Sequence, residues 1–443
     1  MFLLTNGTIV TFNLTNQVIN NGAIAINKAT ITDIGSSEVL CRKYPQAKQY
    51  PLDNKLVLPG MINAHTHLYS AFACGMPISG STENFLRILD NIWWKLDRVL
   101  TLEDVYYSAL VVGIQIIKSG TTTIFDHHSS PAAIPKSLDA IAAALSELGL
   151  RANLCYEVSN RDGQKKTQQA IQENLRWINQ VNSSSATSLL TGTFGLHASF
   201  TINNTTLQQA AELGTELHSG FHIHVAEDKA DQQHAQKKYG KTVVERLAKF
   251  GILGKKTIAA HGVHITQSDI ERLKEYDTIL VHNPGSNMNN AVGIAPIPAM
   301  LKKRLLVGLG TDGLGNDLFT ELRTASFIHK LAHKNPIAFL PNQAIQLAIE
   351  NNRNIASRFF AQPLGIIVPG SAADLIIIDY HPHTPLNSDN IASHLIYGML
   401  PTKIDTVFIN GKKILDAGRL VSIDEETVLA KANKLARKLW NRL

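Results

Sequence analysis

An apolar segment that follows a Pro-Gly turn ends in two histidines one residue apart: Pro59-Gly60-Met61-Ile62-Asn63-Ala64-His65-Thr66-His67. In an extended strand, residues i and i+2 point to the same face, so His65 and His67 can offer two imidazoles to one metal ion. Surface His-x-His pairs also arise by chance. The position at the end of an apolar strand, with further histidines at the ends of later strands, favours a metal site.

After Pro59, apolar strands alternate with helical segments, which is the pattern of a parallel sheet with crossover helices. Between the strands, helices are expected at Thr101–Lys118, where Thr101 can cap with Asp104 and Gly120 ends the turn. Further helices are expected near 135–148, 165–180, 205–218, 241–250, 267–275 and 295–303. Eight strands with their helices predict a TIM barrel. The expected strands are Met61–His65, Thr121–Asp126, Ala152–Glu157, Leu189–His197, Phe221–Val225, Thr257–His261, Thr278–Asn283 and Leu305–Asp312.

The two ends of the chain have a different pattern from the barrel. Residues 1–58 show short strands and turns without a helix, and residues 363–443 add further short strands, an Asn410-Gly411 hairpin turn and a final helix near 424–441. Helices near 317–333 and 342–359 come before this second region. Each terminal region has too few strands to be stable alone. The expected fold is therefore α/β: a barrel at 59–362 and a small β-sandwich built from 1–58 and 363–443.

Polar side chains cluster where the expected barrel strands end, which is where TIM barrels carry their catalytic residues. A single histidine at such a position is usually structural, whereas a convergent set predicts an active site. The set comprises His65, His67, Asp126, His127, His128, Glu157, His197, His224, Glu227, His261, His282, Asn283 and Asp312.

The composition fits an ordinary globular protein of 443 residues with a net charge of +6. Lys and Arg are scattered, which favours a solvated surface over a nucleic-acid site. Three cysteines without a C-x-x-C spacing indicate reduced thiols, and neither a leader sequence nor an apolar segment of membrane-spanning length is recognised. We therefore expect a cytoplasmic protein without nucleic-acid or membrane partners.

The motifs together resemble the amidohydrolase superfamily over essentially the whole chain. Within it, the chain is similar to the aminohydrolase and triazine chlorohydrolase branch that includes guanine deaminase and the methylthioadenosine/adenosylhomocysteine deaminases. Three segments, at 125–128, 195–200 and 283–290, are most similar to the SsnA-type aminohydrolases. The superfamily motifs are Pro59-Gly60-x-x-Asn63-x-His65-x-His67, His222-x-His224-x-x-Glu227, Ala260-His261-Gly262-Val263-His264 and Gly310-Thr311-Asp312-Gly313.

The resemblance implies four metal ligands: His65, His67, His224 and Asp312. Three imidazoles and a carboxylate suit Zn²⁺, with Fe²⁺ as the alternative. His222 lies two residues before His224 and could also face the barrel interior; the spacing to Glu227 favours His224. Two-metal relatives bridge their ions with a modified lysine on strand four, but the chain has no Lys or Arg between Arg176 and Lys229. One divalent ion per chain is therefore expected.

By the same resemblance, Glu227 would carry a proton to a ring nitrogen and His261 would stabilise the oxyanion. Asp312 would take the proton of the attacking water. The candidate substrate contacts are His197, His128, Asn287 and Trp94. Alternatives remain for several of these residues: His127 and His128 could orient ligands, Trp93 and Trp94 could pack a lid or an interface, and the Asn-rich segment could cap turns.

These residues predict a metal-dependent aminohydrolase that removes an exocyclic amine from a purine-like or pterin-like heteroaromatic ring and releases ammonia. Hydrolysis of a ring amide or a carbon-halogen bond is the alternative activity, and a non-catalytic scaffold would be expected to have lost metal ligands. Gly313 stands where many deaminase relatives have Ser. The substrate would be a small heterocycle, and the expected assembly is a homodimer.

Overall fold

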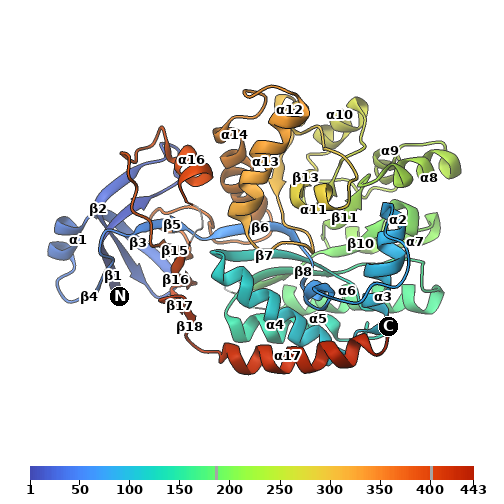
Figure 1. The fold of residues 1–443 in the computed structure, drawn as a ribbon, viewed down its shortest axis with the longest axis horizontal. Helices are drawn as coiled ribbons and strands as arrows, with labels where there is room; N and C mark the ends of the chain where they lie inside the picture. Colours follow the sequence, from blue (N-terminus) through green and yellow to red (C-terminus); the bar gives the residue numbers. More distant parts are fainter. Residues whose placement is uncertain (185–187, 400–402) are drawn as a thin grey trace.

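The computed structural model describes residues 1–184, 188–399 and 403–443 (Figure 1). Within these residues, eight parallel strands form the barrel as two arcs, in the orders β6-β7-β8 and β10-β11-β12-β13-β14. Bridges between Thr66 and Asp312 and between Val158 and Leu196 join the arcs. The TIM barrel is thus confirmed. Its strands are β6 (Met61–Thr66), β7 (Thr121–His128), β8 (Arg151–Tyr156), β10 (Phe194–Ala198), β11 (Phe221–Val225), β12 (Ile258–His261), β13 (Ile279–His282) and β14 (Val307–Leu309).

The prediction of one continuous fourth strand at Leu189–His197 is wrong. It is divided into β9 (Leu190–Gly192), which pairs with β8, and β10, which pairs with β11. The change of partner occurs at Thr193, whose N–H donates to Leu154 O, whereas the next N–H, of Phe194, donates to Gly220 O. The residues that follow Thr193 therefore belong to the barrel wall that carries His197.

Helices cover the outside of the barrel (Figure 1). The expected helix after the first barrel strand is present with its capping box: the Thr101 side chain accepts from Asp104 N, and the Asp104 side chain accepts from Thr101 N. The helices of the barrel are α4 (Leu102–Lys118), α5 (Ser137–Leu148), α6 (Gln164–Asn182), α7 (Asn204–Glu216), α8 (Lys229–Tyr239), α9 (Val243–Lys249), α10 (Gln267–Glu275), α11 (Pro284–Asn289), α12 (Ile297–Lys302) and α13 (Leu318–Ala332).

Three helical regions differ from expectation. Helix α8 was not expected because it buries only Asp231 and Ala235, so it lacks an apolar stripe. Helix α11 occupies the Asn-rich segment, and it begins at Pro284, a residue favoured in a first helical turn. The single helix expected at 342–359 is α14 (Pro341–Ile345), a π-helical turn at Gln346–Asn351, and α15 (Asn352–Ala356).

The two terminal regions combine in one nine-stranded sheet. Strand β5 joins them, because it pairs in parallel with β1 and antiparallel with β15. Apolar side chains of both regions form one cluster that includes Ile9, Ile24, Leu375 and Phe408, so the sheet curls into the expected small β-sandwich. Its strands are β1 (Phe2–Val10), β2 (Val18–Asn27), β3 (Thr30–Ser36), β4 (Lys48–Pro51), β5 (Leu56–Pro59), β15 (Leu375–Ile378), β16 (Ile404–Ile409), β17 (Lys412–Asp416) and β18 (Arg419–Leu420).

The terminal regions also hold corrections. The N-terminal region was expected to lack helices, but α1 (Ser37–Lys43) follows β3, with Ser36 accepting from Val39 N at its start. The expected hairpin is confirmed: Asn410 and Gly411 have φ values of +54° and +73°, as a two-residue type I′ turn requires. The domain limits at 58 and 362 stay predictions. A short helix, α16 (Ile391–Ser393), lies between β15 and β16.

The segment between β6 and α4 forms a helical insert that carries Trp93 and Trp94. It contains a 3₁₀ turn at Leu68–Ala73, α2 (Phe85–Ile88), a π-helical turn at Leu89–Trp93 and α3 (Trp94–Val99). The C-terminal helix α17 (Glu425–Trp440) packs along α4 (Figure 1), and Trp440 Nε1 donates to Phe72 O in the insert. No single helix in the described ranges is long and apolar enough to cross a membrane; α2–α3 and α4 reach that length only as a pair bent by 114°.

Candidate active site

The C-terminal end of β6 is tied to the end of β14 by Asn63. Its Nδ2 donates to Thr311 Oγ1 at 2.8 Å, and its Oδ1 accepts from Thr311 N at 3.2 Å. The carbonyl of His65 also accepts from the backbone N–H groups of Thr311 and Asp312. The Asn of the opening motif therefore closes the barrel at the point where it places Asp312 beside the two histidines of β6.

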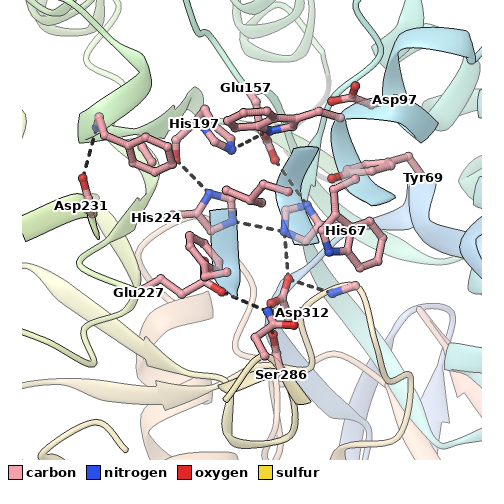
Figure 2. Close-up of a pocket in the computed structure, with 18 residues that line it drawn as sticks. His67, Tyr69, Asp97, Glu157, His197, His224, Glu227, Asp231, Ser286 and Asp312 are labelled. Atoms are coloured by element: carbon pink, nitrogen blue, oxygen red, sulfur yellow. Dashed lines mark hydrogen bonds and ion pairs between the residues drawn. The ribbon is translucent and has the colours of Figure 1, made fainter. Parts of the chain in front are cut away.

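Four side chains that were expected to bind metal converge at this end of the barrel, and Figure 2 shows three of them, His67, His224 and Asp312. The ligand atoms of His65, His67, His224 and Asp312 all lie within 4.8 Å of one another. Asp312 Oδ1 is 3.0 Å from His67 Nε2 and 3.6 Å from His65 Nε2. The Nε2 atoms of His67 and His224 are 3.2 Å apart.

The hydrogen bonds of these histidines fit a metal ion. When both rings are neutral, His67 Nδ1 donates to His127 O and His224 Nδ1 donates to His197 O, so the facing Nε2 atoms carry lone pairs. Two lone pairs 3.2 Å apart repel unless a cation lies between them. His65 Nε2 is buried and has no hydrogen-bond partner. Three imidazole nitrogens and a carboxylate oxygen, held from behind by carbonyls, are a donor set for a divalent ion such as zinc.

The charges at this cluster also favour a cation. Burial works against the charged form of Asp312, but the nearby imidazoles of His65 and His67 hold its pKa well below the usual range. Burial alone would lower the pKa of His67, but the contact with Asp312 raises it to about 9. Burial lowers the pKa of His65 to about 4. The site therefore stabilises positive charge next to Asp312 and keeps His65 neutral, as a metal ligand must be.

Glu227 and His261 form a second group on the other side of Asp312. His261 Nε2 is 3.6 Å from Glu227 Oε2 and 3.7 Å from Asp312 Oδ2, and it has no hydrogen-bond partner. Burial raises the pKa of Glu227, although nearby His261 lowers it in part. Asn290 Nδ2 donates to Glu227 Oε1, and Ser286 Oγ donates to Asp312 Oδ2 (Figure 2). This group can hold and pass a proton within a few ångströms of the metal ligands.

Two residues of the site have left-handed backbone conformations. The φ angle is +75° at His261 and +56° at Asp312, a region where residues other than Gly are uncommon, although Asn, Asp and His adopt it more often than most. Such conformations cost about 1–3 kcal/mol each and persist where the surrounding structure enforces them. At Asp312 the enforcing contact is its N–H bond to His65 O. At His261, the following residue, Gly262, also left-handed at φ +61°, donates its N–H to Val225 O.

A narrow cavity of about 50 Å³ lies over the cluster. Its floor is formed by strand ends and its roof by the insert. Trp94, an expected substrate contact, lies in the wall: its ring faces that of His197 at 6.1 Å, and the Arg161 guanidinium lies 5.2 Å from its centre. The lining comprises His67, Tyr69, Phe85, Leu89, Trp93, Trp94, Asp97, Glu157, His197, Ala198, Phe200, His224, Glu227, Asp231, Ser286, Asn290, Asp312 and Gly313.

Glu157 lines the cavity, although the sequence analysis assigned no specific role to it. It follows β8, and its Oε1 lies 3.4 Å from both His67 Nδ1 and His127 Nδ1. Burial raises its pKa to about 8. Its position after a strand end was the signal that could have assigned it. Ser286 and Asn290, on or just after α11, carried no such signal because that helix was not expected.

Three candidate residues lie away from the cavity. His128 Nε2 pairs with Ser130 Oγ at 2.9 Å, and its ring packs between Tyr69 and Tyr156. Asn287 Oδ1 accepts from His261 Nδ1 at 2.9 Å, so it stands behind His261. Neither residue lines the cavity, although His128 Nδ1 and Asn287 Nδ2 are buried without a hydrogen-bond partner. The substrate contacts expected at these two residues stay predictions. His222 lies beneath His65, with Nε2 2.8 Å from His65 Nδ1.

A model of the Amidohydrolase family matches residues 56–414, and the chain belongs to this family. The chain is 32% identical to a 5-methylthioadenosine/S-adenosylhomocysteine deaminase of Syntrophomonas wolfei subsp. wolfei over 99% of each chain. Its fold is similar to that of an adenosine deaminase from Xanthomonas campestris with bound zinc, with a TM-score of 0.87 and 21% identity over 100% of this chain and 99% of that one. It is also similar to an atrazine chlorohydrolase from Arthrobacter aurescens, with a TM-score of 0.83 and 21% identity over 98% and 100% of the two chains.

Proposed function

We propose that the protein is a metal-dependent deaminase that hydrolyses the exocyclic amine of a purine-like heteroaromatic ring. The observation that carries the proposal is the convergence of Glu227, His261 and Asp312 on one side of the histidine cluster. Similarity to the S. wolfei deaminase over 99% of both chains supports the same reaction class. The expected ligands His65, His67 and His224 retain the geometry that a divalent ion requires.

The residues divide the work of one hydrolysis. A divalent ion at the cluster would act as a Lewis acid and bring the pKa of a bound water toward about 7. Asp312 accepts a proton as water adds to the ring carbon. Glu227, with its raised pKa, delivers a proton to the adjacent ring nitrogen and then helps to protonate the amine. His261 lies between the two carboxylates, where it can stabilise charge on the adding oxygen. The carbon–nitrogen bond breaks, and ammonia leaves a ring carbonyl behind.

The alternative reaction is displacement of a halide from the ring, the reaction class named for an atrazine chlorohydrolase of similar fold. Matched amino and chloro substrates distinguish the two reactions. Chloride leaves without a proton, whereas an amine must be protonated first. Glu227→Gln should therefore slow a matched amino substrate far more than its chloro analogue. Equal losses on both would mean that Glu227 positions the substrate, and would remove the main support for deamination.

The direct test is ammonia release from purified, metal-analysed protein with purines, pterins, pyrimidines and triazines. Ammonia from at least one aminated ring, lost with Glu227→Gln, is the expected result. Activity on chloro compounds alone would contradict the proposal.

We propose finer assignments on the same basis. One zinc ion per chain is supported by the convergence of His65, His67, His224 and Asp312 and by the absence of Lys between Arg176 and Lys229. Two metal equivalents per chain in a fully active preparation would contradict this. Relationship to the SsnA-type aminohydrolases, a homodimer and a cytoplasmic location remain proposals from the sequence motifs.

A further inference from the structure

The roof of the cavity is apolar and narrow. Phe85, Leu89 and Trp93 of the insert line it, and Phe200 lies in the wall beside His197. A sugar carries hydroxyl groups that need hydrogen-bond partners when they are removed from water, and each unmet group costs about 1–3 kcal/mol. The roof side chains named here offer no oxygen acceptor for such a group.

The acidic side chains near the roof are already engaged. Asp231 Oδ1 accepts from Phe200 N at 3.1 Å, and its Oδ2 accepts from Ala226 N at 2.9 Å. Asp97 pairs with Arg161, and its Oδ2 also accepts from Ser129 Oγ at 2.9 Å. Asp97 Oδ1 is buried and has no surface open to the cavity. Neither carboxylate is therefore free to bind ribose hydroxyls.

The cavity also lacks a partner for an anionic tail. Among its described lining residues there is no Lys or Arg, whereas five are Asp or Glu. Arg161 lies behind Trp94, and its charge is paired with Asp97. A carboxylate or phosphate on the substrate would face these acids without a counter-charge. The wall thus disfavours substrates such as nucleotides or nucleosides with an amino-acid tail.

The inner wall presents two hydrogen-bond acceptors, His197 and the ionised form of Glu157. Thr201 Oγ1 donates to Ala198 O at 3.0 Å, so it accepts from His197 Nδ1 at 2.7 Å. The proton of the neutral imidazole is then on Nδ1, and Nε2 is an acceptor. This Nε2 lies 3.8 Å from Glu157 Oε2, on the side of the cavity opposite Asp312 (Figure 2). Two acceptors side by side match a ligand edge that carries N–H donors.

We infer that the substrate is a free aminated heterocyclic base, without a sugar or an anionic tail, whose ring N–H groups donate to Glu157 and His197. This inference rests on the proposed deaminase function and narrows its substrate class. It separates this chain from a relative named for 5-methylthioadenosine and S-adenosylhomocysteine, which are nucleosides. Glu157 would then be a specificity-determining residue of the site.

Matched pairs of compounds test the inference. Ammonia release and ligand-induced thermal stabilisation are measured on the metal-loaded protein with adenine and adenosine, guanine and guanosine, and 5-methylthioadenosine. We expect kcat/KM for the base to exceed that for its nucleoside at least tenfold, and stabilisation by bases only. Equal or better turnover or binding of a nucleoside, or stabilisation by none of the bases, would overturn the inference. Base-selective stabilisation without ammonia from any compound would refute the deaminase proposal and leave this inference standing.

The variant Glu157→Gln tests whether Glu157 recognises the substrate or instead orients the metal ligand His67. The change should raise KM for the best base at least tenfold, with kcat within about threefold and metal content unchanged, because the amide replaces an acceptor with a donor. Glu271→Gln, at an exposed carboxylate paired with Lys303, is the matched control and should change neither constant. A fall in kcat together with loss of metal would show instead that Glu157 orients His67, and would overturn its assignment to specificity.

Discussion

The floor and the roof of the cavity are built by different means. Floor residues such as His65 and Asp312 leave the ends of barrel strands, and backbone hydrogen bonds of neighbouring strands fix their positions. Roof residues such as Leu89 and Trp93 lie on short helical turns that are held by side-chain packing. The floor is therefore suited to chemistry that requires fixed geometry, and the roof to selecting what enters.

The largest effect should come from removing a floor ligand. His224→Ala deletes one of three imidazoles around the metal position, so bound metal should fall below about a tenth of the wild-type level, and activity with it. Metal analysis and ammonia release measure this. His381→Ala, at an exposed histidine outside the site, should change neither. A His224→Ala protein with full metal content would break the assignment of the floor as the metal site.

Next in size is the proton carrier of the floor. Glu227→Gln keeps shape and removes the titrating group, so kcat should fall by a factor on the order of 10² to 10⁴ while metal stays bound. The control is Glu271→Gln. Proportional loss of metal and activity would instead make Glu227 a ligand.

The third prediction concerns Glu321, which lies beneath the floor and should make the free energy of unfolding depend on pH. Glu321 on α13 accepts from Gly285 N at the start of α11, and burial raises its pKa from 4.5 to about 7. A raised carboxyl pKa means that the folded state holds a proton that the unfolded chain has released, so stability falls as pH rises from about 4.5 to 7. Glu321→Gln should remove this fall and leave the protein about 1–3 kcal/mol more stable than wild type at pH 8, with little difference at pH 4.5. Urea unfolding at both pH values measures it, and a variant that is less stable at pH 8 would contradict the raised pKa.

The smallest effect is expected at the roof. Leu89→Ala enlarges the entrance without touching a floor residue, so KM should rise a few-fold while kcat and metal content stay near wild type. Steady-state kinetics with metal analysis distinguish the two constants. Loss of metal in this variant would show that roof and floor are coupled more closely than their separate construction suggests.

The same division explains what the sequence could predict. The floor follows from local pattern: an apolar strand ending in His65-x-His67 places both rings on one face, and the ligands come together because parallel strands end at one edge. Glu227 and His261 were found in the same way. The roof does not follow, because Phe85 and Leu89 look like ordinary apolar residues of short helices, and only tertiary packing shows that they line a cavity.

Particular errors have similar causes. Helix α8 has almost no apolar stripe, and α11 lies in an Asn-rich segment. The periodicity of apolar residues therefore predicts neither helix. The substrate contacts expected at Asn287 and His128 stay predictions. A residue near a strand end was expected to face the substrate, but the direction of its side chain depends on partners such as His261 and Ser130. The joining of the two terminal regions in one sheet was predictable, because neither region has enough strands to be stable alone.

That shared sheet has a consequence for how the chain folds. Strand β5 leads directly into β6 and its histidines, and its partner β15 comes from the far end of the chain. Pairings between such distant segments have a high loop-closure cost and form slowly. The register of Pro59 opposite Leu375 should thus be among the late events of folding, and the metal-binding strand should acquire its final alignment only then.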